Sequence, residues 1–357
     1  MTPLASELAR QIAATGPIPL NQFMAACLTH PVHGYYTGRD PLGAAGDFTT
    51  APEISQMFGE LLGLSLAQAW LDRGAPNPFL LTELGPGRGT LMADVMRATK
   101  SVLGFHDAAR LHLVEVSEPL RAAQAKTLQP HTPTWHDTIA DLPDGPLFLI
   151  ANEYFDALPI RQFQRLGDGW SEKMVALDDT GAPCFGWSPP APLADLAHRL
   201  DDTQEGDIVE VNLVAAQDAG LIAGRIAAHG GAAILVDYGD WRSLGDTLQS
   251  VRNHEPEHPL ANPGNADLTA QTDFEPLALA ATKAGAAHSR VTPQGLFLER
   301  LGITARAQAL AANFSGPALE AHIAAHRRLT HPEGMGTLFK VMSIHPIETA
   351  PPPGLDP

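Results

Sequence analysis

The segment FLLTELGPGRGTLMADVMRATKSVL, residues 79–103, decides the fold prediction. It begins with a short apolar run that ends in an acid, passes through three closely spaced glycines, and then takes up helical spacing. Glycines let a backbone turn sharply and approach a ligand closely, and the start of the next helix offers N–H groups that have no partner within the helix. This order of strand, glycine turn and helix predicts an α/β sheet that binds a ligand beyond the end of the strand.

The spacing of the glycines argues against two common phosphate-binding loops. A dinucleotide fingerprint has the form G-x-G-x-x-G, but Thr90 occupies the third glycine position and Gly89 comes one residue early. No Gly-Lys-Ser/Thr sequence follows, so the segment is not a P-loop. Glu83, just before the turn, opposes an anion there and favours a ligand that carries an amine, together with a carboxylate for the helix end.

The rest of the chain supports a doubly wound, mostly parallel sheet. Apolar runs occur at 109–116, 146–153 and 230–239, and they alternate with helical stretches such as 118–128 and 213–228. A run that is apolar along its whole length is typical of a parallel strand buried on both faces. We therefore expect an α/β fold whose ligands lie at the carboxyl ends of the strands.

Departures from this alternation predict the domain organisation. Residues 1–76 are expected to form an N-terminal helical cap with a lid loop. A core at 77–344 follows, with insertions at about 160–212, where we expect a hairpin, and at about 240–270. The proline-rich residues 345–357 are expected to be a disordered tail.

The lid loop of the cap spans residues 34–53. It combines Tyr35, Tyr36 and Phe48 with Asp47 in a stretch too rich in glycine and proline for a helix. A long polar and aromatic loop in a compact protein is often a lid or a binding loop. We predict that it closes over the cofactor, with ordinary packing as the alternative.

The composition describes a globular protein with an acidic surface. Of the 357 residues 44% are hydrophobic, enough for a sizeable core, and the formal net charge is −17. An extended nucleic-acid surface is therefore not expected, and neither is membrane insertion, because no run of about 18 apolar residues occurs. Cys27 and Cys184 match no metal or redox spacing, and no secretory signal is visible, so we predict a cytoplasmic protein without a metal.

Two further acids come where the next strands end. Glu115 lies at the end of the run 109–116, where an acid can accept hydrogen bonds from both ribose hydroxyls. Asp137 follows the expected third strand and is a candidate acceptor for the exocyclic amine of adenine. Each acid alone is more often a solvated strand end. Glu83, Glu115 and Asp137 together match the amine, the ribose and the adenine of S-adenosylmethionine, a cofactor without phosphate.

The apolar run 146–153 leads directly into Asn152, Glu153 and Asp156. Acids at the end of a buried strand are costly unless they are paired. We interpret Glu153, and second Asp156, as catalytic groups that bind a cationic substrate group such as a guanidinium. Asn152 is expected to contact the cofactor. Helix capping or a structural ion pair is the alternative interpretation.

The string HEPEH at 254–258 formally matches the zinc-protease motif H-E-x-x-H. That chemistry needs both histidines on one face of a helix. Pro256 within the motif and Pro259 directly after it oppose a helix. We therefore reject the metal site and expect a polar loop.

Several segments together resemble the MidA-type family of S-adenosylmethionine-dependent methyltransferases. The matching segments cover most of the chain between about residues 4 and 343: GDFTTAPEISQMFGELLG (46–63), ELGPGRGTLMADVMR (83–97), LVEVSEPLR (113–121), LIANEYFDALPIRQF (149–163), VDYG (236–239), GDTLQSVRNH (245–254) and MGTLFKV (335–341). The glycine block is shared by many class I methyltransferases, whereas 46–60 and 152–159 are specific to this family. A mitochondrial complex I assembly factor is its eukaryotic member.

The resemblance implies a seven-stranded class I methyltransferase sheet and S-adenosylmethionine as the cofactor. Its motifs place cofactor ligands at Glu83, Gly85, Gly87, Gly89 and Glu115, and with a weaker match at Asp137. It also implies methylation of a partner protein, with an arginine of a complex I subunit as the substrate of the mitochondrial member. The alternative is an assembly factor or chaperone that binds the cofactor with little or no turnover. The sequence leaves an oligomer open.

Overall fold

The computed structural model describes residues 2–38 and 50–357 of the chain. These residues form two compact units, each assembled from segments that are distant in the sequence. We call them the core unit (50–155, 216–241 and 274–357) and the accessory unit (2–38, 156–215 and 242–273).

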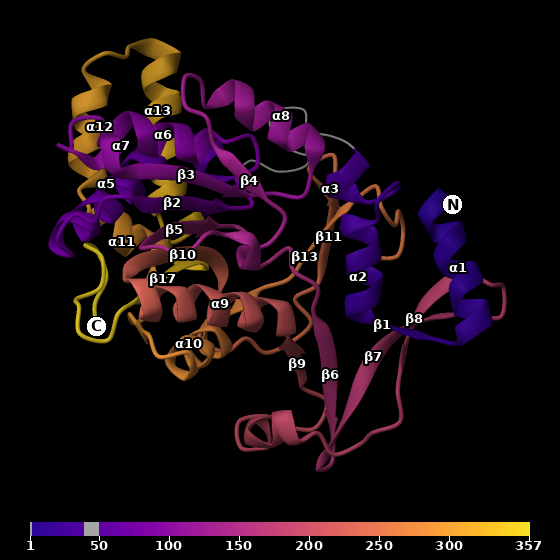
Figure 1. The fold of residues 1–357 in the computed structure, drawn as a ribbon. Helices are drawn as coiled ribbons and strands as arrows, with labels where there is room; N and C mark the ends of the chain where they lie inside the picture. The colour runs from indigo at the N-terminus through magenta and orange to yellow at the C-terminus, as the bar shows by residue number, and fades with distance from the viewer. Residues whose placement is uncertain (1, 39–49) are drawn as a thin grey trace. The chain divides into compact units, whose positions relative to one another are not determined.

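The core unit is built around one mixed sheet. Its main path runs through seven strands in the order β15–β17–β10–β5–β2–β3–β4, and Figure 1 shows β3, β2, β5, β10 and β17 one below the other. The strands are β2 (Phe79–Leu84), β3 (Ala109–Val114), β4 (Thr134–His136), β5 (Leu147–Asn152), β10 (Gly231–Asp240), β15 (Ala287–His288), β16 (Thr292–Pro293) and β17 (Phe339–His345). The strands from β10 to β4 pair in parallel, whereas β17 is antiparallel to β10. The predicted α/β, mostly parallel sheet is confirmed.

Helices connect these strands as the alternation predicts. They are α4 (Ala51–Ile54), α5 (Gln56–Asp72), α6 (Thr90–Thr99), α7 (Phe105–Ala108), α8 (Glu118–Thr127), α9 (Leu213–His229), α10 (Phe274–Lys283), α11 (Gln294–Arg300), α12 (Ile303–Ala311), α13 (Gly316–Thr330), α14 (Met335–Leu338) and the 3₁₀ turn η1 (Ile139–Asp141). None of the helices in the described ranges is long and apolar enough to cross a membrane.

The helix α5 belongs to the core unit rather than to the expected N-terminal cap 1–76. Its residues are buried on nearly all sides, from Met57 and Phe58 to Ala69 and Trp70. A helix that is apolar all round lies in the interior of a protein. It packs against α6, β5 and β10, and its side chains join the main hydrophobic cluster of this unit.

The residues 345–357 are not the disordered tail that we expected. Leu355 is only 8% exposed and joins the main hydrophobic cluster. The Pro353 carbonyl accepts a hydrogen bond from Ser65 Oγ at 2.8 Å, and the Asp356 carbonyl accepts one from the Arg290 N–H at 2.9 Å. Prolines lower the entropy of the unfolded chain, so a proline-rich end can pack where partners exist.

The accessory unit has two small antiparallel sheets. One runs β1–β7–β6–β9, with β8 also on β7, and the other runs β12–β11–β13. The elements are α1 (Pro3–Thr15), β1 (Ile18–Pro19), α2 (Leu20–Thr29), α3 (Tyr35–Gly38), β6 (Arg161–Leu166), β7 (Gly169–Leu177), β8 (Pro183–Trp187), the 3₁₀ turn η2 (Ala194–Leu200), β9 (Ile208–Val211), β11 (Gln249–Arg252), β12 (Glu255–Glu257), β13 (Asp267–Thr269) and β14 (Thr272–Asp273). The predicted hairpin within 160–212 is β6–β7, in which Leu166 pairs with Gly169.

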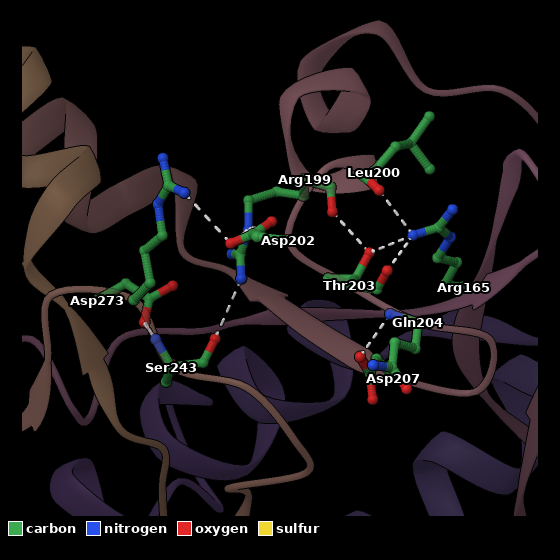
Figure 2. A network of polar contacts seen from close by, with 10 residues as sticks. Arg165, Arg199, Leu200, Asp202, Thr203, Gln204, Asp207, Ser243 and Asp273 are labelled. Atoms are coloured by element: carbon green, nitrogen blue, oxygen red, sulfur yellow. Dashed lines mark hydrogen bonds and ion pairs between the residues drawn. The ribbon is translucent and has the colours of Figure 1, made fainter.

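Figure 2 shows how polar contacts hold the irregular segment after η2 in this unit. Arg165 Nη1 donates to the Leu200 carbonyl at 2.7 Å and to Thr203 Oγ1 at 3.1 Å. Asp202 receives Arg199 Nε at 3.0 Å and Arg242 Nη1 at 3.2 Å. These bonds to backbone and carboxylate groups replace the regular ladder that the segment lacks.

Two further predictions fall in the accessory unit. The HEPEH segment begins in the turn of the hairpin β11–β12, where Asn253 and His254 have positive φ, and continues as the strand β12. It is not helical, as expected, but it forms a strand rather than the expected polar loop. Of the predicted lid, Tyr35 and Tyr36 lie in α3, whereas Asp47 and Phe48 lie outside the described residues. The lid stays a prediction.

Candidate cofactor-binding and active site

The carboxyl ends of four parallel strands meet at one edge of the core sheet. Leu84 of β2 lies opposite Val114 of β3 and opposite Ala151 of β5, and Val114 lies opposite His136 of β4. The predicted site residues of the core unit directly precede or follow these strand ends. Register alone therefore places Glu83, Glu115, Asp137, Asn152 and Glu153 along the same edge, where α/β sheets bind ligands.

The glycine turn between β2 and α6 needs its glycines. Gly85, Gly87 and Gly89 have φ of +56°, +54° and +81°, values that residues with a side chain rarely adopt. A Cβ on Gly85 would also lie 3.2 Å from the ring of Tyr154. The Gly85 N–H donates to the Val114 carbonyl at 3.0 Å, which fixes the turn against β3.

Glu83 is buried beneath this turn and is 3% exposed. Its carboxylate accepts a hydrogen bond from the backbone N–H of Met92 in the first turn of α6. Burial, and to a smaller extent the nearby Glu115 charge, raise its pKa to about 8. Within the described residues its Oε2 has no hydrogen-bond partner. A buried acceptor of this kind is costly unless a ligand donor reaches it.

Glu115 is 8% exposed and is held in place through both carboxylate oxygens. Oε1 accepts the Ser117 N–H at 2.8 Å, and Oε2 accepts Gln124 Nε2 at 3.2 Å. Burial raises its pKa, while these bonds and the Arg121 charge oppose the rise. Each oxygen keeps lone pairs for further donors, so two neighbouring hydroxyls suit this carboxylate.

Asp137 differs from the other acids of the edge because its side chain is 75% exposed. Its Oδ1 pairs with Arg121 Nη2 at 2.6 Å, and Arg121 Nε donates to the Glu115 carbonyl at 2.7 Å. Arg121 therefore links the ends of β3 and β4. Arg121 was not predicted from the sequence as part of this edge. The role of Asp137 as an acceptor for adenine stays a prediction.

Asn152 and Glu153 form the fourth part of the edge. Asn152 Nδ2 donates to Glu153 Oε1 at 3.2 Å, and the Ala51 N–H donates to the same oxygen at 3.1 Å. Burial raises the pKa of Glu153, whereas these two hydrogen bonds and the Arg328 charge lower it; the pKa is raised overall. Glu153 has φ +51°, a strained value for a glutamate, and strain of this kind clusters at functional sites.

Asp156 belongs to the accessory unit, whereas Glu153 belongs to the core unit. The Asp156 side chain is 7% exposed, and its backbone carbonyl accepts the Ala270 N–H at 3.0 Å. The pKa of Tyr36 is raised first by burial, then by the charge of Asp267, and then by the charge of Asp156. Tyr36 in turn donates to Asp267 at 3.0 Å. The catalytic role of Asp156 stays a prediction.

The residues present fit S-adenosylmethionine. Three buried oxygens of the edge have no hydrogen-bond partner within the described ranges: Glu83 Oε2, Ser117 Oγ and Asn152 Oδ1. Asn152 Oδ1 can only accept, and Glu83 accepts through both oxygens once it is ionised, whereas the cofactor carries an ammonium, ribose hydroxyls and an exocyclic amine that donate.

Comparison with known proteins gives one family. The family model Methyltransf_28, described as "Putative S-adenosyl-L-methionine-dependent methyltransferase", matches residues 61–292. The chain is 38% identical to the protein named protein arginine methyltransferase NDUFAF7, mitochondrial, from Danio rerio, with 96% of this chain and 86% of that protein covered. Its identity to the Homo sapiens protein of the same name is 36%, with 97% and 84% covered.

A solved structure agrees over nearly the full length. A COG1565 superfamily protein from Burkholderia thailandensis, bound to S-adenosyl-homocysteine, superposes with a TM-score of 0.82 and 29% identity. The match covers 99% of this chain and 92% of that chain.

Proposed function

Since the chain belongs to the family of S-adenosylmethionine-dependent methyltransferases, we propose that it methylates an arginine side chain of a partner protein. The relatives of 36–38% identity that are named protein arginine methyltransferases support the choice of arginine. The observation that carries the proposal is the half-buried, strained and doubly hydrogen-bonded carboxylate of Glu153 at the end of β5.

Several contacts hold Glu153 in its strained backbone conformation. Its own N–H donates to the Val236 carbonyl of β10 at 2.9 Å. Two residues later the Phe155 N–H donates to Asp237 Oδ2 at 2.9 Å, and Asp237 is fully buried. Left-handed φ at a residue with a side chain costs about 1–3 kcal/mol and persists only where surrounding contacts impose it. These contacts impose the backbone conformation of Glu153, from which its carboxylate oxygen Oε1 reaches the Ala51 N–H at 3.1 Å.

The second oxygen, Oε2, is the one that we assign to the substrate. No residue in 2–38 or 50–357 is seen to donate a hydrogen bond to it. A guanidinium is protonated at neutral pH, so its nitrogen can form a new bond to carbon only if a proton leaves. Glu153 orients the guanidinium and accepts that proton, and its raised pKa makes it a better base than an exposed glutamate.

The cofactor, when bound, supplies an electrophilic methyl group on a sulfonium. We assign its amino group to Glu83, its ribose hydroxyls to Glu115 and its closest backbone contact to the turn at Gly85, Gly87 and Gly89. Asn152 Oδ1 faces the same edge as Glu153 and completes the contacts of the amino acid part. Asp137 is proposed for the adenine amine, through the carboxylate oxygen that does not pair with Arg121.

The partner and the compartment are finer proposals. A subunit of respiratory complex I is the proposed protein substrate, as the family resemblance implies. A cytoplasmic location is proposed from the composition and the cysteine usage, whereas the named relatives are mitochondrial.

Methyl transfer to a lysate tests the proposal. The full chain is incubated with radiolabelled S-adenosylmethionine and a lysate of cells that lack this protein, and the labelled proteins are hydrolysed to amino acids. We expect label in methylarginine, carried by few bands. A folded protein that binds S-adenosylhomocysteine but transfers no label would favour the assembly-factor alternative. Label in methyllysine would contradict the arginine assignment.

A further inference from the structure

One buried amide connects three parts of the cofactor site. We propose that Gln124 of α8 is a positioning residue for the cofactor, because its side chain fixes the glycine turn and the ribose acid relative to each other. The inference rests on the cofactor site of the proposed function and is independent of the substrate. In Figure 1 α8 lies beside β4 and β3; its partner Trp135 belongs to β4, and Glu115 directly follows β3.

The orientation of the Gln124 amide follows from its partners. Nε2 donates to the Gly87 carbonyl at 2.8 Å and to Glu115 Oε2 at 3.2 Å, and Oε1 accepts from Trp135 Nε1 at 2.8 Å. A carbonyl and an ionised carboxylate can only accept, and an indole N–H can only donate. The flipped amide would therefore break all three bonds.

The Gln124 amide contacts the glycine turn from the side of α8, through the Gly87 carbonyl. Gln124 is completely buried, and its Cα lies 3.4 Å from the position that a Cβ on Gly89 would take. The turn thus rests directly on α8. Gly87 presents its carbonyl to Gln124, which holds the peptide in one orientation and leaves the rest of the turn for the ligand.

The position of Gln124 in the sequence carries a signal. Leu120, Gln124 and Leu128 follow one another at intervals of four, so they lie on one face of the helix. Leu120 and Leu128 are buried, and a glutamine between them must bury its amide. A polar group in such a place is kept only when its hydrogen bonds are satisfied, as these are.

Gln124 also helps to keep Glu115 ionised. The charged or titratable groups that act on Glu115 are Glu83 on β2, Arg121 on α8 and Tyr154 after β5. Burial disfavours the charged carboxylate, and the bond from Gln124 is one of few that oppose this. A protonated Glu115 has lost one of its two acceptor oxygens for ribose.

The experiment compares Gln124→Met with a matched control. Methionine has a similar length and flexibility but forms none of the three bonds. Gln68→Met on α5 removes an exposed helical glutamine whose amide donates to Asp72 Oδ1 at 2.8 Å. Calorimetric titration with S-adenosylhomocysteine should show a Kd raised about 10- to 100-fold for Gln124→Met, the range for losing a residue that orients the groups that bind a ligand. Gln68→Met should bind as the wild type does.

A double-mutant comparison separates positioning from general loosening of the fold. In a Glu115→Gln background, Gln124→Met should raise the Kd for S-adenosylhomocysteine at least about threefold less than it does in the wild type, because the bond from Nε2 to the Glu115 carboxylate is no longer charged there. A folded Gln124→Met with wild-type affinity, or an equal rise in Kd in both backgrounds, overturns the proposal.

Two further results keep the outcome decisive. If Gln124→Met does not fold, Trp135→Phe removes the donor that orients the amide, and a smaller rise in Kd of about threefold to tenfold is expected. Wild-type affinity in Trp135→Phe then overturns the proposal. A wild-type chain that binds no S-adenosylhomocysteine contradicts the cofactor site itself, which is a different failure.

Discussion

Glu83→Gln should make the ligand-free protein more stable while it removes cofactor binding. The pKa of Glu83 is about 8 in the folded chain against 4.5 for an ordinary glutamate, because the carboxyl is buried. A glutamine resembles the protonated acid and still accepts the Met92 N–H. It therefore removes the penalty of burying a group that prefers to ionise.

The magnitude follows from proton linkage. Between pH 4.5 and 8 the folded chain holds a proton that the unfolded chain has lost, so stability falls as pH rises through this window. Integration of the shift to pH 7 gives roughly 3 kcal/mol of destabilisation for the wild type. The gain from Glu83→Gln should therefore be small near pH 4.5 and about 3 kcal/mol at pH 7.

Two assays read this out. Scanning calorimetry at pH 5 and pH 7.5 should show a melting-temperature gain for Glu83→Gln that is several degrees larger at pH 7.5. Titration of the wild type with S-adenosylhomocysteine at pH 7, in buffers of different ionisation enthalpy, should show release of about 0.9 proton, since a pKa of about 8 leaves roughly nine tenths of Glu83 protonated. Glu118→Gln, at an 81% exposed side chain, is the control. A stability gain that does not change with pH, or binding without proton release, would refute the reasoning.

Three other substitutions test separate parts of the account. Gly87→Val should abolish binding of S-adenosylhomocysteine, because φ +54° is strongly disfavoured for a branched residue. If calorimetry shows unchanged affinity in a folded variant, the turn does not contact the cofactor. Glu115→Ala should weaken binding of the same ligand by about 1.5–3 kcal/mol. A loss below about 0.5 kcal/mol would show that Glu115 is a solvated residue at the strand end and does not bind the ribose. Glu60→Gln should lower the free energy of unfolding by about 1–2 kcal/mol at pH 7, a value discounted for the partly exposed arginines. Burial acts to raise the Glu60 pKa, but Arg306 and Arg97 lower it overall, so the effect should shrink as pH falls below about 4.5 and vanish only below the lowered pKa; urea unfolding from pH 7 down into the acid range checks this.

The strand ends were predictable from sequence because their signals are local. The apolar run at 79–84 coincides with β2, and the glycine turn follows it at once. Parallel pairing then places successive strand ends at one edge whatever the loops between them do. Glu83, Glu115 and Glu153 could therefore be placed along one edge of the sheet without coordinates.

The supporting residues could not be predicted in the same way. Arg121, Gln124 and Trp135 act together only because β4 pairs with β3 and α8 packs beside them, and these contacts join residues that are remote in sequence. The grouping of residues 2–38 with 156–215 is likewise a long-range property. The prediction for the proline-rich residues 345–357 was wrong because their composition is typical of disordered segments, whereas their packing depends on partners that are distant in the sequence, such as Ser65.

The most direct measurement of the central claim is single-turnover methyl transfer by Glu153→Gln, with radiolabelled S-adenosylmethionine and the protein labelled in the lysate assay. Glutamine keeps an acceptor for the Ala51 N–H and for Asn152 but cannot take a proton. We expect unchanged affinity for S-adenosylhomocysteine and transfer at least about 100-fold slower, the low end for a positioned acid–base group. Transfer at the wild-type rate would contradict it, because the substrate carboxylate would then lie elsewhere.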